Sequence, residues 1–433
     1  MNQHNASTTT VSRSKNPRIA LVIHPLHTHG GAEIHLKAVS DAYPTAPIFT
    51  AWSDPAIGEK FFPEREIITT WFGKLPIFLK RMSIFIPLQR RLYKGMHAKL
   101  QGFDKVFVLT DGFEKLAILP QEHGFVAQWV SKLFSRAGNT ASVASRTKYI
   151  FDVLTPPRFL WMKTRSRKLS RNVFFKIYEK LLLNRLHKRW KEDDKAAVRR
   201  ADKVFANSKA VQQRILKFYG VQSTVLYPPV SLIDTLQAIQ RQPSEGRESF
   251  YLYFGRVESY KGVDLAIKAC IQSGKNLKIA GTGKDEKRLR QLAANLLPST
   301  EVTRNSAATR ADHPQIEFLG FVDDKTRNEL FATCKALIYP VKDEDFGLIP
   351  IEANAAGVPV IAYKGGGVAE TVIDGKTGVF FDEYNENALE SAIEKFENLS
   401  KSKKSQAIKP EDCRENAKRF SREKFLQRLS EVL

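Results

Sequence analysis

The chain has 433 residues, of which 42% are hydrophobic and 26% are charged, and its formal net charge is +22. This composition is typical of a folded globular protein, and the length suits two domains rather than one. The three cysteines lie far apart without a CxxC pair, which excludes a disulfide framework and a structural zinc site and fits a reducing cytoplasm. No apolar run reaches the ~18 residues that span a bilayer, and the leader is polar, so we expect neither a membrane span nor a secretion signal.

The first half of the chain predicts a parallel α/β domain. Gly30 and Gly31 connect an apolar run to a stretch with helical spacing, which begins a βαβ unit, although the spacing is not GxGxxG. Further short apolar runs alternate with helical stretches. The predicted strands lie within 18–26, 104–111, 146–157 and 202–208. We therefore predict a Rossmann-like domain over 18–238, after a disordered leader over 1–17.

The second half repeats this pattern after a polar segment with Pro and Gly at 239–249, which we interpret as the linker. Strand-like segments separated by helical stretches predict a second Rossmann-like domain over 250–410. A helical segment over 411–433 would pack back toward the first domain. The predicted strands lie within 250–257, 276–283, 316–322, 336–341, 358–367 and 377–381. The fold class is α/β, with two doubly wound domains facing across a cleft.

Two cations follow the first strand of this second domain. Arg256 lies just past the strand, and Lys261 lies five residues later, where the next helix begins. Ligands of open α/β sheets bind beyond the carboxyl ends of the strands, and a helix N-terminus favours anions. The pair suits a diphosphate. Two solvated surface cations are the alternative.

Two acids lie eight residues apart in the stretch EDFGLIPIEANAAG. Glu344 falls on a loop, and Glu352 falls within the first turn of a helix that we expect to begin near Pro350. Carboxylates accept hydrogen bonds from vicinal hydroxyls, and the free N–H groups of the helix start can meet oxygen atoms of a sugar or a phosphate. This corner therefore suits a nucleotide sugar.

These motifs resemble those of glycosyltransferase family 4, the glycosyltransferases group 1, which are retaining transferases of the GT-B fold. The acids look like the E-x7-E signature of that family, and GRVESYKG looks like its diphosphate pair. The likeness continues through GGGVAETVIDGKTG and covers essentially the whole second domain. The implied fold is GT-B, and the implied activity is sugar transfer from a nucleotide sugar. The resemblance also implies that the domain over 18–238 binds the acceptor and the domain over 250–410 binds the donor.

The resemblance also implies roles for single residues. Arg256 and Lys261 would neutralise the leaving diphosphate, Glu352 would bind the ribose, and Glu344 would contact the transferred hexose. No protein nucleophile is required, so the acids are not read as those of a glycosidase. Donor contacts from the backbone would come from Gly30, Gly31, Phe346, Gly347 and Leu348.

Two other patterns could suggest a metal. Asp343 and Asp345 form a DxD inside the E-x7-E loop, and three histidines cluster after the first strand, at His24, His27 and His29. A loop facing the cleft explains the histidines, and we expect neither a metal nor a cofactor.

The first domain resembles more loosely the subgroup with mannosyl- and rhamnosyltransferases of surface polysaccharide assembly. TPPRFLW, ADKVFANS and VLYPPV carry this likeness. The subgroup has a histidine where this chain has Leu154, so the sugar-contacting imidazole is missing. Asp111, at the end of its strand, and Arg158 are candidate contacts to the acceptor or the sugar, and a helix cap is the alternative for Asp111.

The positive charge gathers in two mixed basic and apolar segments of the first domain. Residues 71–99 hold seven basic residues and no acid, and residues 163–191 hold eleven against one acid, Glu179. Such segments suit a helix lying on anionic lipid. Core packing on one face is the alternative, and RNA binding is a weaker one because no nucleic-acid module is present.

The prediction is a cytoplasmic, metal-independent, retaining hexosyltransferase, peripheral on the inner face of the cell membrane. It would move a hexose, with mannose preferred, from GDP-mannose or a UDP-hexose to a lipid-linked sugar or polysaccharide acceptor, and it would not bind nucleic acid. A catalytically degenerate GT-B protein that serves as a membrane- or glycan-binding scaffold is the alternative.

Overall fold

The structure is a computed structural model that describes residues 17–27, 30–74, 86–120, 147–162, 184–297, 313–401 and 407–431. Its described residues form two compact units. The first unit comprises those of 1–29, 39–152 and 157–204, and the second comprises those of 30–38, 153–156 and 205–433. Each unit is described by itself below.

The first sheet has seven strands in the order β3-β2-β1-β4-β5-β6-β7. Its strands are β1 (Ile19–Val22), β2 (Ile48–Thr50), β3 (Ile67–Thr69), β4 (Lys105–Thr110), β5 (Lys148–Val153), β6 (Lys203–Ala206) and β7 (Thr224–Val225). Strand β1 pairs in parallel with both β2 and β4. All four of its residues are buried, as expected of a strand that is covered on both faces.

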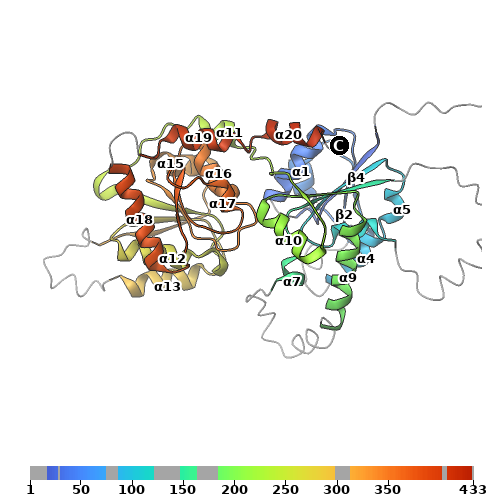
Figure 1. Ribbon diagram of the computed structural model, residues 1–433, viewed down its shortest axis with the longest axis horizontal. Helices are drawn as coiled ribbons and strands as arrows, with labels where there is room; N and C mark the ends of the chain where they lie inside the picture. Colours follow the sequence, from blue (N-terminus) through green and yellow to red (C-terminus); the bar gives the residue numbers. More distant parts are fainter. Residues whose placement is uncertain are drawn as a thin grey trace, which may run out of the picture. The chain divides into compact units, whose positions relative to one another are not determined.

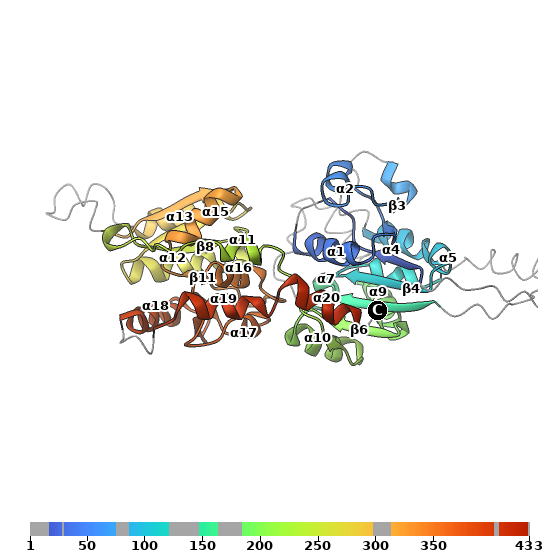
Figure 2. The same cartoon turned by 90° about the horizontal axis from the view of Figure 1, so that it is seen from above.

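Helices follow the strands of this sheet in chain order (Figure 1). They are α1 (Gly31–Ala42), α2 (Pro55–Phe61), α4 (Ile86–Lys94), α5 (His97–Leu100), α7 (Arg158–Trp161), α9 (Asn184–Arg200), α10 (Lys209–Tyr219) and α11 (Ile233–Gln237). Helix α2 connects β2 to the edge strand β3, beside which it lies in Figure 2. Its N-terminus is capped by Asp54, whose carboxylate accepts a hydrogen bond from Ala56 N.

A buried ion pair fixes the 3-10 helix η3 (Glu114–Ile118) against α9. Lys115 Nζ lies 2.9 Å from Asp194 Oδ1, and both side chains are almost fully buried. Trp161 Nε1 donates to the second carboxylate oxygen at 2.6 Å. Removing either charge would leave the other buried and unpaired, which costs several kcal/mol.

The two basic segments are described only in part, because 75–85 and 163–183 lie outside the described residues. In the described part, Arg90 and Lys94 of α4 both pair with Asp193 of α9. Trp190 is buried, whereas Trp71 is 60% exposed. These contacts agree with core packing for one face of the segments, and the contact with lipid stays a prediction.

The second sheet has six strands in the order β10-β9-β8-β11-β12-β13, and all neighbours are parallel. Its strands are β8 (Phe250–Phe254), β9 (Asn276–Ala280), β10 (Ile316–Gly320), β11 (Leu337–Tyr339), β12 (Val360–Tyr363) and β13 (Gly378–Phe381). This order means that the chain winds outward in one direction from β8 and then crosses back to β11 on its other side. A topological switch point therefore lies between β8 and β11.

Helices cover both faces of this sheet (Figure 1). Alternate residues of β8 enter two separate cores, since Phe250 and Leu252 join one, while Tyr251 and Tyr253 join the other. The first core includes residues of α11, α15 (Asp324–Thr333), α16 (Leu348–Ala355), α17 (Val368–Thr371) and α19 (Pro410–Lys418). The second includes residues of α12 (Val263–Gln272), α13 (Glu286–Leu296) and α18 (Glu386–Lys401). Helix α20 (Arg422–Ser430) is the last described element.

The predicted fold class is confirmed, because two doubly wound α/β sheets are present and every strand predicted from an apolar run occurs. Strands β2, β3 and β7 were not predicted; each has three residues or fewer. Within the described residues, no helix is both long enough and apolar enough to cross a membrane.

An ion-pair network ties α18 to the second sheet. Glu397 accepts hydrogen bonds from Lys335 Nζ at 2.9 Å and from the Tyr251 hydroxyl at 2.8 Å, and Lys275 Nζ lies 3.3 Å away. Burial disfavours the charged carboxylate, but the hydrogen bonds from Lys335 and Tyr251 outweigh it and lower the pKa of Glu397 from 4.5 to about 2.

We predict that Glu397→Gln lowers the stability of the second unit by about 2 kcal/mol at neutral pH, a figure reduced to allow for solvent screening. The stabilisation is complete above pH 4.5 and is lost as the pH falls through that value toward about 2, because the folded pKa is the lower one. Thermal midpoints measured from pH 7 to pH 3 should converge for the two proteins. A difference that stays constant over this range would contradict the assignment.

Candidate active site

The candidate site lies at the switch point of the second sheet, beyond the carboxyl ends of β8 and β11. Lys261 ends the 3-10 helix η6 (Ser259–Lys261), which follows β8. Glu344 lies on the connection between β11 and α16. The chain leaves these adjacent strands in opposite directions, which opens space for a ligand in folds of this kind.

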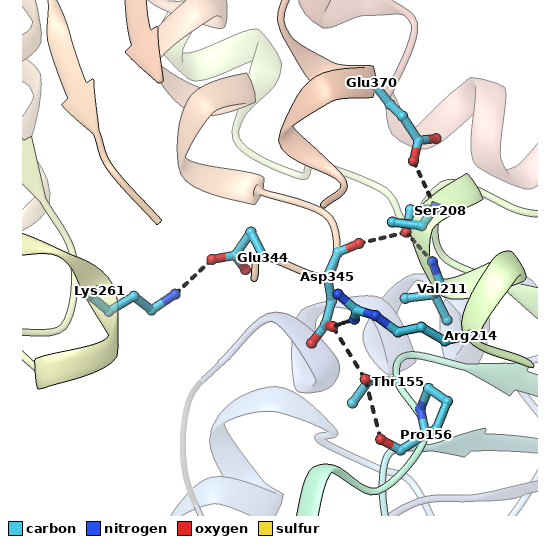
Figure 3. Close-up of polar contacts among 10 residues, drawn as sticks. Thr155, Pro156, Ser208, Val211, Arg214, Lys261, Glu344, Asp345 and Glu370 are labelled. Atoms are coloured by element: carbon cyan, nitrogen blue, oxygen red, sulfur yellow. Dashed lines mark hydrogen bonds and ion pairs between the residues drawn. The ribbon is translucent and has the colours of Figure 1, made fainter. Parts of the chain in front are cut away.

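The structure brings the predicted cation and acid together (Figure 3). Lys261 Nζ lies 2.7 Å from Glu344 Oε2, and the two side chains are 12% and 19% exposed. The Tyr339 hydroxyl donates to the same oxygen at 2.7 Å. Burial, followed by the charge of Glu344, raises the pKa of Tyr339 well above 10, so this hydroxyl remains a donor at physiological pH.

The glycine triplet Gly365–Gly367 follows β12 and packs directly against the backbone of the loop between β11 and α16, which is called the Glu344 loop below. Gly367 N donates to Glu344 O at 2.9 Å. A Cβ atom on Gly366, whose φ is +57°, would lie 2.1 Å from the same carbonyl oxygen. A Cβ atom on Gly367 would lie 2.4 Å from Asp345 O. The two backbones approach this closely only because no side chain stands between them.

Helix α16 begins at Leu348, two residues earlier than predicted. Glu352 therefore lies in the second turn, not the first, which corrects the sequence-based placement. The helix follows Gly347, whose φ is +95°, and no side chain caps its first N–H groups. Burial raises the pKa of Glu352, and the charge of Arg327 offsets this only in part.

The side chain of Phe346 lies in the core of the second unit. Its ring is buried and lies 5.7 Å from the Tyr227 ring and 5.5 Å from the Phe420 ring. Its side chain anchors the loop, so only its backbone amide is available for the predicted contact with a sugar.

Arg256, the second predicted cation, is on the same β8–α12 connection as Lys261. Its carbonyl oxygen accepts a hydrogen bond from the Tyr253 hydroxyl at 2.8 Å, and the residue is exposed. The backbone of Arg256 is thus held, while its side chain can reach into solvent.

Gly31 also belongs to the second unit, and it is tightly packed. A Cβ atom on Gly31 would lie 2.6 Å from Leu348 Cδ1, at the start of α16. A Cβ atom on the preceding Gly30 would lie 3.2 Å from Glu33 Oε2. Packing against Leu348 is therefore one reason for a glycine at position 31. Contact of Gly30 and Gly31 with a donor phosphate stays a prediction.

The first sheet has a switch point of its own, between β1 and β4. His24 follows β1, Asp111 follows β4, and His24 Nδ1 lies 3.6 Å from Asp111 Oδ1. Burial opposes ionisation of Asp111, but its interaction with His24 outweighs it and lowers the pKa of this carboxyl. The Asp111 side chain is 44% exposed, so it remains accessible to a ligand. Arg158 begins the short helix α7 after β5 and is half-buried.

Among the residues that the structure describes, no group of three or more His, Cys, Asp or Glu side chains could hold a metal ion. His29 lies outside the described residues, and His24 is engaged with Asp111. In the DxD, Asp345 forms an ion pair with Arg214.

Residues 234–420 match the family described as "Glycosyl transferases group 1". This part of the chain is a group 1 glycosyltransferase domain. The match covers both motifs that carried the resemblance, together with the glycine triplet, and the group 1 assignment made from them is confirmed for these residues.

Several named proteins are similar to this chain. An uncharacterized glycosyltransferase of Methanocaldococcus jannaschii is 28% identical over 247 residues, which are 55% of this chain and 61% of that protein. An alpha-1,3/1,6-mannosyltransferase of Dictyostelium discoideum is 28% identical over 203 residues, 41% of this chain and 48% of that protein. The matched part thus spans about half the length of these relatives.

Solved structures are similar over nearly the whole chain. HepE of Anabaena in complex with UDP-glucose has a TM-score of 0.62 at 18% identity, covering 96% of this chain and 99% of that one. The lipopolysaccharide outer core galactosyltransferase WaaB has a TM-score of 0.63 at 14% identity, covering 96% and 100%. At these identities the likeness shows the fold alone, and it confirms the predicted GT-B class.

We predict that Gly366→Ala displaces the Glu344 loop, because the new methyl group would collide with the Glu344 carbonyl oxygen. Hydrogen exchange of the amides in 343–348 should quicken by tenfold or more. Gly375→Ala is the matched control, since Gly375 also has a positive φ of +73° but nothing within 4 Å of its added Cβ. Equal exchange in both variants would show that backbone strain alone, not the close approach, matters.

Proposed function

We propose that this protein is a retaining, metal-independent hexosyltransferase that uses a nucleoside-diphosphate hexose as donor. The observation that carries the proposal is the pair of Lys261 and Glu344, 2.7 Å apart at the switch point of the donor domain. A cation and a hydrogen-bond acceptor at one point match the two parts of such a donor, an anionic diphosphate and a hydroxylated ring.

In this proposal Lys261 and Arg256 act on the leaving group. As the bond between the anomeric carbon and the phosphate oxygen breaks, negative charge grows on the nucleoside diphosphate. Cations held in place before the reaction stabilise that charge without reorganisation, by several kcal/mol. Contact with Glu344 holds the ammonium group of Lys261 in position beforehand.

Two carboxylates would bind hydroxyl groups of the donor. Glu344 would accept from the hexose, and Glu352 from the ribose, while N–H groups at the start of α16 would meet oxygen atoms of the sugar or its phosphate. The acceptor oxygen would bond to the anomeric carbon on the face that the diphosphate leaves, and its proton would pass to a phosphate oxygen. Neither glutamate serves as a nucleophile.

On the acceptor side we propose Asp111, with Arg158 as a second candidate. Asp111 is exposed at the switch point of the first sheet, where its carboxylate can accept a hydrogen bond from an acceptor hydroxyl. Against the effect of burial, its interaction with His24 lowers the pKa of this carboxyl, which favours the ionised form. The half-buried Leu154 offers no polar group in place of the subgroup histidine.

The donor is proposed to be GDP-mannose, with a UDP-hexose second, and the acceptor a lipid-linked sugar or glycan. A related protein is named an alpha-1,3/1,6-mannosyltransferase, which supports mannose as the transferred sugar, and a structural neighbour was solved with UDP-glucose, which supports a UDP-hexose as the second choice. Peripheral contact with an anionic membrane on the cytoplasmic side completes the proposal, on the strength of the basic segments.

Lys261→Ala and Glu352→Ala should each lower donor affinity or turnover by tenfold or more when purified protein is given GDP-mannose or UDP-glucose. Lys268→Ala is the control. This lysine of α12 pairs with Glu386 of α18 at 3.2 Å, outside the proposed site. Wild-type kinetics in both site variants would remove the site assignment. If the unmodified protein binds membranes yet turns over no nucleotide sugar, the scaffold alternative is favoured.

Turnover should persist within twofold in excess EDTA. The proposed neutralisation of the diphosphate comes from Lys261 and Arg256, and the DxD carboxylate of Asp345 is already paired with Arg214. The measurement is the initial rate after dialysis against EDTA, with and without added Mg²⁺ or Mn²⁺. A rate that disappears with EDTA and returns with either metal would contradict metal independence.

A further inference from the structure

Asp345, the residue after Glu344, bonds the Glu344 loop to segments of the second unit that lie far from it in the sequence (Figure 3). Asp345 Oδ1 forms an ion pair with Arg214 Nη1 of α10 and accepts a hydrogen bond from Thr155 Oγ1 at 3.2 Å. Ser208 Oγ donates to the backbone oxygen of Asp345 at 2.5 Å. Both the side chain and the backbone of this one residue are therefore held.

The partners of Asp345 are themselves fixed in place. Ser208 is the N-cap of α10, and its Oγ accepts a hydrogen bond from Val211 N at 3.1 Å. Asp345 and Arg214 are only 23% and 16% exposed, so their charge-assisted hydrogen bond is partly shielded from water.

A second carboxylate, 25 residues after Asp345 in the chain, also bonds to the start of α10. Glu370 of α17 accepts hydrogen bonds from the backbone N–H groups of Lys209 and Ala210, at 2.9 and 3.1 Å. The Tyr227 hydroxyl donates to the same carboxylate at 3.0 Å. The start of α10 is thus bound both to the Glu344 loop and to α17.

Neighbouring acids of the loop point in different directions. Figure 3 shows the Glu344 side chain directed toward Lys261 and the Asp345 side chain directed toward Thr155 and Arg214. Because consecutive residues share a peptide unit, the place of Asp345 limits where the Glu344 carboxylate can lie. Phe346, buried on the other side of Asp345, restricts the loop further.

We propose that Asp345 is a positioning residue for sugar transfer, which acts through Glu344 and depends on Arg214, Ser208 and Thr155. This inference rests on the proposed function, in which Glu344 contacts the hexose. Nucleotide binding depends on Lys261, Glu352 and the start of α16, and it should survive loss of the tie. The rate of sugar transfer should fall, because even a small displacement of a group that contacts the reacting sugar slows the reaction.

The test compares Asp345→Asn, Arg214→Gln and the double variant. Each single variant should lower kcat at least tenfold, while the Kd for the free nucleoside diphosphate changes less than threefold. The double variant should lose no more than either single one, since the pair acts as a unit. Arg214→Lys keeps the positive charge beside Asp345, so its kcat should lie between those of Arg214→Gln and the unmodified protein. Glu397→Gln is the control, because it breaks a comparable ion pair of the same unit away from the loop, and its kcat should stay within twofold.

Unaltered kcat in Asp345→Asn and Arg214→Gln would overturn the inference. So would a joint loss of kcat, nucleotide affinity and thermal midpoint, because that pattern marks a merely structural role. Absence of turnover in the unmodified protein would count against the proposed function instead. In that case hydrogen exchange at the amides of 344–346 decides, since the tie predicts at least tenfold faster exchange in Asp345→Asn, and unchanged exchange would refute it.

Discussion

The contact between Lys261 and Glu344 is the interaction on which the interpretation of this protein depends. It joins the connection that leaves β8 to the one that leaves β11, at the switch point of the second sheet. An ion pair between a largely buried lysine and a largely buried glutamate stabilises the fold only weakly, because the loss of their hydration offsets most of their attraction. Their value is chemical: an ammonium group and a carboxylate are held together at the point where the proposed function places the diphosphate and the hexose of the donor.

The two sheets use the same strand order around their switch points, and each places an ionisable pair there. In the first sheet the pair is His24 and Asp111, and in the second it is Lys261 and Glu344. The second pair is supported more strongly, because the glycine triplet and the ring of Phe346 hold the loop that carries Glu344. The Asp111 side chain is also the more exposed of the two acids, at 44% against 19% for Glu344.

The sequence allowed the fold to be predicted where strands are long and covered on both faces. The apolar runs of β4 and β8, of six and five residues, have the length of a buried strand and are too short for a typical helix, whereas the three residues of β2 give no periodic signal. The start of α16 was placed too late because Pro350 suggested a first-turn position. The helix in fact begins after Gly347, whose left-handed backbone is not visible from residue type alone.

Within the candidate site, residues that belong to a compact motif could be found, and residues that act from a distance could not. Tyr339 ends an apolar strand and looks like a core residue, so only coordinates show its hydroxyl bonded to Glu344. Thr155 and Arg214 lie 190 and 131 positions from Asp345 in the chain. No local pattern links them, and a third partner, Ser208, looks like an ordinary helix cap.

A crystal structure with a bound nucleoside-diphosphate hexose tests the central claim most directly. The account predicts a diphosphate oxygen within about 3 Å of Lys261 Nζ and a hexose hydroxyl donating to Glu344. A nucleotide sugar bound away from the carboxyl ends of β8 and β11, with Lys261 and Glu344 touching only each other, would contradict it.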